Sequence, residues 1–129
     1  MIFGLGTDIV EVFRMKDAIK KWGDNFLSKI FTPREIRYSN SRRFFHQHFA
    51  ARFAAKEAVI KAFGEWRQFP IKWTDIEVLN DKEGKPTIEF HRDALKLKNK
   101  KKVGEVALSI AHSKNYAIAN VILLKKGIK

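Results

Sequence analysis

The segment ARFAAKEAVIKA occupies residues 51–62 and lies within a longer stretch, residues 43–63, that contains neither glycine nor proline. Alanine, the residue with the highest helix propensity, recurs here at positions 50, 51, 54, 55, 58 and 62. At about 100° per residue these alanines fall on one side of a helix, opposite Phe49, Phe53, Val59, Ile60 and Phe63. The stretch predicts a long central helix that is buried on two faces.

Two polar residues of this helix fall between its buried faces. Glu57 and Lys61 lie one turn apart on this seam, and a glutamate four residues before a lysine is also the favoured order for an ordinary surface ion pair, which contributes only about 0.3–0.5 kcal/mol. Lys56 points into the aromatic side, where the sequence offers no local partner. Taken alone, these residues are no evidence of a functional site.

The first forty residues predict a strand followed by two helices. Residues 1–5 are apolar and strand-like, Gly4 and Gly6 are expected to let the chain turn, and a helix is expected over residues 10–22. Asp8 would then lie where the strand meets the helix, a common place for a capping aspartate. Thr32-Pro33-Arg34-Glu35 has the pattern of a capping box and predicts a second helix start.

After Gly64 the hydrophobic pattern changes from a helical period to alternation. Strands are predicted at residues 75–79, 86–90, 105–111 and 116–124, with turns at 80–85 and 112–115. A short helix is expected at residues 91–97, followed by a lysine-rich loop at 98–102. Because helices come mostly first and hairpins mostly after, the sequence predicts an α+β fold with the long helix packed on an antiparallel sheet.

The composition indicates one globular domain with a basic surface. The chain has 129 residues, 45% of them hydrophobic, so a single domain over residues 1–129 is expected. Lys and Arg number 26 against 14 Asp and Glu, which gives a net charge of +12 and predicts an acidic partner. There is no cysteine and no apolar run near the ~20 residues that span a bilayer, so we expect no disulfide, no membrane partner and a cytoplasmic location.

A basic charge is also typical of small nucleic-acid-binding modules. The sequence, however, shows no reading helix, aromatic RNA-binding strand or zinc spacing, and most of its phenylalanines fall at core-facing positions. A basic scaffold that only binds acidic proteins is a third alternative, and it gives Asp8, Glu57 and Lys61 no role. Because the recognition motifs are missing, we expect no nucleic-acid partner. Both alternatives predict that Glu57→Ala leaves binding intact, whereas an enzyme would lose magnesium-dependent turnover.

Asp8, Glu57 and Lys61 are more informative together than singly. Two carboxylates on different elements, a lysine one turn from the second and a surplus of cations are the parts needed to bind a phosphate ester through a divalent ion. Magnesium is usually held by one or two carboxylates together with substrate phosphates, and a nearby lysine stabilises a departing phosphate. The pattern favours phosphoryl-type chemistry.

Three segments of the chain resemble the signature segments of the holo-acyl-carrier-protein synthase family, the small single-domain 4′-phosphopantetheinyl transferases. They are Gly4-Leu5-Gly6-Thr7-Asp8-Ile9-Val10-Glu11, residues 51–62 quoted above, and Leu108-Ser109-Ile110-Ala111-His112-Ser113. Residues 31–35, 73–78 and 84–86 extend the similarity in the same order over nearly the whole chain. The resemblance implies the fold of that family and a homotrimer with active sites between subunits.

The resemblance also implies an activity and a catalytic set. The family transfers the 4′-phosphopantetheine group of coenzyme A to a serine of apo acyl carrier protein, with magnesium, and releases adenosine 3′,5′-bisphosphate, for fatty acid biosynthesis. Asp8 and Glu57 match the magnesium ligands, and Lys61 matches the lysine that neutralises or protonates the leaving phosphate. The serine proton would pass to a carboxylate at the metal, directly or through water.

Two further sets of residues match binding positions of the family. The coenzyme A pocket is implied at Arg52, Gly84, Pro86, His112 and Ser113, with Arg42 and Arg43 near the 3′-phosphate. The surface that docks the acidic carrier is implied at Arg14, Lys16, Lys20 and Lys21. The chain departs from the family pattern at residues 65–70, where many members have a glycine-rich loop, and at Ala111, where serine is common.

Overall fold

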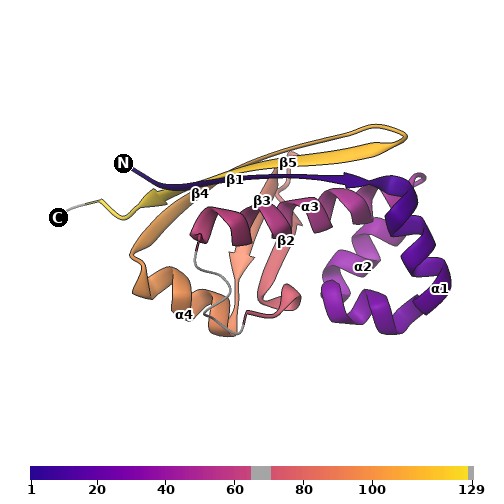
Figure 1. The fold of residues 1–129 in the computed structure, drawn as a ribbon, viewed down its shortest axis with the longest axis horizontal. Coiled ribbons are helices and arrows are strands. Elements are labelled where there is room, and N and C mark those ends of the chain that lie inside the picture. Colours follow the sequence, from indigo (N-terminus) through magenta and orange to yellow (C-terminus); the bar gives the residue numbers. More distant parts are fainter. Residues whose placement is uncertain (65–70, 128–129) are drawn as a thin grey trace.

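A three-stranded antiparallel sheet and one long helix form the centre of the molecule. The computed structural model describes residues 1–64 and 71–127. The sheet contains β1 (Ile2–Glu11), β5 (Tyr116–Lys125) and β4 (Val103–His112), in that order, and α3 (Phe45–Phe63) runs along one of its faces (Figure 1). The predicted α+β architecture, with a long helix packed on an antiparallel sheet, is confirmed.

The three remaining α-helices of the described residues lie toward the ends of α3. Helices α1 (Val12–Ile30) and α2 (Pro33–Asn40) lie at one end, and α4 (Arg92–Lys100) lies near the other (Figure 1). Strands β2 (Ile76–Asn80) and β3 (Pro86–Phe90) pair as a separate two-stranded antiparallel sheet, preceded by the short 3-10 helix η2 (Trp73–Asp75). The predicted hairpins are therefore present, but they form two sheets.

Helix α3 belongs to both hydrophobic cores of the chain. Ala54, Ala55 and Ala58 pack in the core against the sheet, whereas Phe49, Ala50 and Ala51 pack in the core against α1 and β5. All six alanines of the helix are buried, as its pattern predicted. The helix begins at Phe45, two residues later than the predicted start at residue 43.

The beginning of the chain differs from the sequence prediction. Strand β1 continues to Glu11, so Gly4 and Gly6 lie inside it and Asp8 does not lie between a strand and a helix. A Cβ atom at Gly4 or Gly6 would come within 1.9 Å of the carbonyl oxygen of Ala62 or Ala58. These glycines are needed for close contact between β1 and α3 rather than for a turn.

Helix α1 is longer than predicted. It begins at Val12 rather than at residue 10 and continues past residue 22 to Ile30, with a kink at Gly23, whose φ is +56°. Glycine adopts this left-handed conformation without the steric cost that a Cβ atom brings, so the helical segments on either side can change direction.

Helix α2 begins as predicted. The Thr32 side chain accepts a hydrogen bond from the Glu35 backbone N–H, and the Glu35 side chain accepts one from the Thr32 N–H. Both halves of the capping box are therefore formed.

Helix α4 extends to Lys100, so the prediction of a lysine-rich loop over residues 98–102 is wrong in its first half. Lys98 and Lys100 lie in the last turn of the helix, where positive side chains interact favourably with the helix dipole. The departure from the family pattern at residues 65–70 lies outside the described residues.

Candidate active site

Asp8 and Lys61 come from different elements and meet on the side of β1 that faces α3. The Lys61 ammonium donates hydrogen bonds to Asp8 Oδ1 at 2.8 Å and to the Thr7 carbonyl at 3.2 Å. Asp8 is half-buried and Lys61 is exposed. The contact exists because Gly4 and Gly6 let β1 approach the helix.

Glu57 lies one turn before Lys61 on α3 and is half-buried. Burial raises the pKa of Glu57, the negative charge of Asp8 raises it further, and Lys61 lowers it. Both carboxylates line the same groove, and Lys61 pairs with Asp8. Two carboxylates in this arrangement are oxygen donors of the kind that Mg²⁺ prefers, so the residues fit a divalent cation.

The two carboxylates open onto a groove of about 460 Å³. Arg14 lines the same groove, and an apolar surface from three elements completes it: Met15, Ala18, Phe26, Phe53 and Tyr116. The groove thus combines charged groups with an apolar wall, as sites for elongated polar ligands do.

A second groove, of about 440 Å³, has a different character. It is lined by four cationic side chains and one acidic one: Arg34, Arg42, Arg52, Lys82 and Asp81. Gly84 also lines it, whereas Pro86 is the first residue of β3 just beyond the turn. The charge of this groove favours an anionic ligand.

Arg52 is the most buried cation of the second groove. Its guanidinium lies 4.1 Å from the centre of the Tyr38 ring, and Arg42 lies 4.4 Å from the same ring. Burial lowers the pKa of Arg52, and Glu35 and Tyr38 act in the opposite direction.

His112 is the last residue of β4, at the turn where the sequence placed it. Its Nδ1 lies 3.0 Å from Gln47 Oε1, and its ring centre lies 5.0 Å from that of His48. The His48 ring in turn lies 5.9 Å from Tyr38. A row of rings therefore connects His112 with the wall of the second groove.

Two other predicted residues lie apart from this row. Ser113 is exposed in the turn that follows His112. Arg43 lines a third groove, of about 340 Å³, together with Phe13 and Lys16. On a single chain, Arg43 is therefore not in the groove that contains Arg52.

Within one chain, the predicted site residues form two separate groups. The groove of Asp8 and Glu57 and the groove of Arg52 and Gly84 share no described lining residue. Helix α3 connects them, since it carries both Arg52 and Glu57.

The four predicted docking residues are exposed on α1. Arg14 borders the first groove and Lys16 the third, so these cations do not share one face. Lys21 makes an exposed ion pair with Asp17 at 3.2 Å.

A buried polar network beside the site was missed by the sequence analysis. The fully buried Lys56 ammonium donates to Glu35 Oε1 at 2.7 Å and to the carbonyls of Ile30, Trp73 and Ile76. Glu35 also accepts from the Val78 N–H at 2.9 Å. Lys56 lies on an apolar helix face, and a buried lysine charge is stabilised by a buried acidic partner. This need for a partner is the signal in the sequence that could have led to Glu35.

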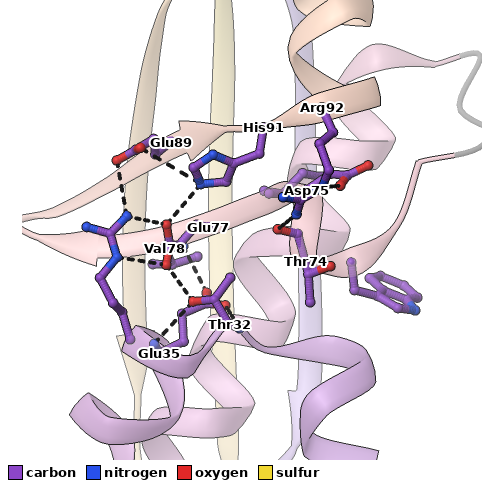
Figure 2. Close-up of polar contacts among 12 residues, drawn as sticks. Thr32, Glu35, Thr74, Asp75, Glu77, Val78, Glu89, His91 and Arg92 are labelled. Carbon is purple, nitrogen blue, oxygen red and sulfur yellow. Dashed lines mark hydrogen bonds and ion pairs between the residues drawn. The ribbon is translucent and has the colours of Figure 1, made fainter.

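Glu77, Glu89 and His91 are close enough to offer three ligand atoms within 4.8 Å of one another (Figure 2). The Glu77 carboxylate is already engaged, because it accepts hydrogen bonds from Arg34 and Thr32 and contacts His91. Burial alone would raise the pKa of Glu77, but these hydrogen bonds lower it to about 2. Arg34 therefore supplies the positive charge that pairs with Glu77 and Glu89. The cluster connects α2 to β2 and β3.

Comparisons with known proteins agree with this fold. A family model described as "4'-phosphopantetheinyl transferase superfamily" matches residues 4–121. The chain belongs to this superfamily.

Its relatives define the family within it. A holo-[acyl-carrier-protein] synthase of Koribacter versatilis is 45% identical over 123 residues, which cover 95% of this chain and 98% of that protein. The crystal structure of the Neisseria meningitidis holo-[acyl-carrier-protein] synthase has a TM-score of 0.89 and 32% identity, covering 97% of this chain and all of the other. That of the Bacillus anthracis synthase, in complex with CoA (3',5'-ADP), has a TM-score of 0.78 and 34% identity, covering 98% and 99%. The chain is a member of the holo-[acyl-carrier-protein] synthase family.

Proposed function

We propose that this chain transfers the 4′-phosphopantetheine group of coenzyme A to a serine of an apo acyl carrier protein for fatty acid biosynthesis. The observation that carries the proposal is the position of Asp8, Glu57 and Lys61. They converge from β1 and α3, and both carboxylates open onto one groove. Relatives that cover nearly the whole chain are named for this activity.

The reaction is a displacement at phosphorus. The serine oxygen forms a bond to the phosphorus that carries the pantetheine arm, and the bond from that phosphorus to the bridging oxygen of the pyrophosphate breaks. Adenosine 3′,5′-bisphosphate leaves with the bonding electrons, and the serine proton passes to a carboxylate of the Asp8–Glu57 pair, directly or through water. Lys61, whose pKa is raised mainly by its hydrogen bond to Asp8, is a cation that neutralises the leaving phosphate.

Asp8 and Glu57 are the residues that would hold Mg²⁺. Their half-buried positions on the wall of one groove support a cation there. When bound, the ion would neutralise phosphate charge that Lys61 alone does not offset.

The second groove is the proposed site for the nucleotide end of coenzyme A. Arg52 and Gly84 line it, with Arg42 next to Arg52 on the Tyr38 ring. The His112 ring contacts the His48 ring, which contacts the Tyr38 ring on the wall of this groove. Pro86, Ser113 and Arg43 stay in the proposed coenzyme A set on the resemblance alone.

We propose that the chain forms a homotrimer of single domains, with each active site between neighbouring subunits. The sheet face opposite α3 supports this, because Leu5, Ile9 and Ile118 on it are 68%, 61% and 38% exposed. Pairing places Ile9 beside Ile118 and Leu5 beside Ile122, with the polar pair Thr7 and Asn120 between them, so the face carries two apolar pairs. Assembly would also bring the first groove of one subunit close to the second groove of another.

The proposed carrier is acidic, and the net charge of +12 supports it. Arg14, Lys16, Lys20 and Lys21 of α1 are the proposed docking residues. Among the described residues, no helix is long and apolar enough to cross a membrane. A cytoplasmic location without a nucleic-acid partner remains a prediction from the sequence.

The proposal is tested with conservative variants of the two carboxylates. Asp8→Asn and Glu57→Gln should fold normally and form holo-carrier at least about a hundred times more slowly than the unaltered protein, because each removes a charged metal ligand. Glu83→Gln, in the exposed turn before β3, is the matched control. Unchanged rates in both site variants would contradict the assignment.

A further inference from the structure

Asn80, the last residue of β2, connects the buried Arg52 to the turn that follows the strand. Arg52 Nη2 donates a hydrogen bond to Asn80 Oδ1 at 2.6 Å, and Asn80 Nδ2 donates one to the Gly84 carbonyl at 3.0 Å. One amide side chain thus contacts both residues through which the second groove is proposed to bind coenzyme A.

Arg52 is an unusual cation because it is buried without a direct ion pair to an acidic side chain. It is 4% exposed, makes no ion pair with a described residue, and its Nε has no hydrogen-bond partner. A buried charge without a directly paired counter-charge is costly, and an anionic ligand in the groove would offset this cost. Arg52 and Gly84 both line that groove.

The side chain of Asp81, the acidic residue that follows Asn80, hydrogen-bonds within the turn. Asp81 Oδ1 accepts hydrogen bonds from the backbone N–H groups of Glu83 and Lys85, both at 2.9 Å. Gly84 has a φ of +86°, which glycine adopts without strain. The turn is therefore held by its own contacts, and the neutral Asn80 is the side chain that links it to Arg52.

We propose that Asn80 is a positioning residue for coenzyme A: it fixes the Arg52 guanidinium beside the Gly84 turn while leaving its positive charge available to a phosphate of the substrate. An aspartate at this position would make the same contact with Arg52 and offset its charge, but it would lose the hydrogen bond to the Gly84 carbonyl. The inference rests on the proposed function, because it takes the anion of the second groove to be coenzyme A.

Asn80→Asp separates this role from a purely structural one. We expect the KM for coenzyme A to rise about tenfold or more, since a hydrogen bond to a charged group contributes at least this factor. The kcat at saturating coenzyme A should change less than about twofold. The new carboxylate pairs with Arg52 but cannot donate to the Gly84 carbonyl, so the melting temperature should fall no further than in Asn80→Ala, which loses both contacts. Asn99→Asp, on the exposed side of α4, controls for the added negative charge.

Asn80→Ala and Arg52→Ala complete the experiment. Both should raise the KM for coenzyme A while leaving the KM for the carrier unchanged. If Arg52→Ala raises the KM but Asn80→Asp and Asn80→Ala do not, Asn80 has no positioning role and the proposed function stands. If the unaltered protein neither binds coenzyme A nor modifies a carrier, the proposed function itself fails.

Discussion

Gly6 of β1 lies so close to Ala58 of α3 that a Cβ atom at Gly6 would come within 1.9 Å of the Ala58 carbonyl oxygen. Alternate residues of a strand share one face, so Asp8 points to the same side of β1 as Gly6. The close contact therefore brings Asp8 within hydrogen-bond distance of Lys61, at 2.8 Å. The candidate active site depends on this contact between two backbones.

Gly6→Ala should damage both stability and activity. The added methyl group meets backbone rather than a movable side chain, so β1 must shift away from α3. Overpacking of this kind costs about 1–3 kcal/mol, which denaturant unfolding would measure. Gly127→Ala, where a Cβ atom meets nothing within 4 Å, is the control. Equal stability of the two variants would show that the close contact is not required.

Lys56→Met should destabilise the fold strongly. It leaves the Glu35 carboxylate buried without its cation, a change that costs about 3–5 kcal/mol in the free energy of unfolding. Adding Glu35→Gln to this variant should recover part of the loss. Lys21→Met, which breaks the exposed pair with Asp17, should cost less than about 1 kcal/mol. A similar cost for Lys56→Met and Lys21→Met in urea titrations would contradict the role of the buried network.

His48 should make the protein sensitive to acid. Burial lowers the pKa of His48 to about 4, and the nearby His112, Arg52 and Arg42 contribute. The unfolded chain binds the proton near pH 6.5 and the folded chain only near pH 4, so stability falls as the pH decreases through this interval. His48→Phe keeps a ring and should flatten this part of the profile of melting temperature against pH. An unchanged slope would mean that His48 is not held neutral.

The exposed face of the sheet should be required for assembly. Ile9→Lys places a charge on this face, next to Ile118, and it should convert a trimer of 15.0 kDa chains into monomers with little activity. Leu95→Lys, which adds the same charge at an exposed position on α4, should leave the trimer intact. Sedimentation velocity measures both masses. An unaltered protein that is monomeric at assay concentrations would contradict the proposed assembly.

Local signals in the sequence were sufficient for much of the fold. The capping box at Thr32 and the alternation in residues 116–124 depend on neighbouring residues, and both predictions were correct. Gly4 and Gly6 were misjudged because their contact lies more than fifty residues away in α3. A glycine gives the same local signal in a turn and in a tightly packed strand.

The site was less predictable than the fold. Nothing local to Asp8 indicates that Lys61 donates to it; the two were grouped by their chemistry and by the resemblance to a family, without a predicted contact. Lys56 and Glu35 are separated by twenty-one positions, and Arg52 and Asn80 by twenty-eight. Partners at such separations are chosen by the tertiary structure, so their pairing cannot be derived from helical or strand periodicity.

Intact-mass spectrometry of an apo acyl carrier protein tests the central claim most directly. The carrier is incubated with this protein, coenzyme A and MgCl₂, with parallel samples that contain EDTA or a carrier whose acceptor serine is replaced by alanine. We predict a mass gain of one phosphopantetheine group that is absent in both controls. No gain on several acidic carriers, from a protein shown to be folded, would contradict the proposed function.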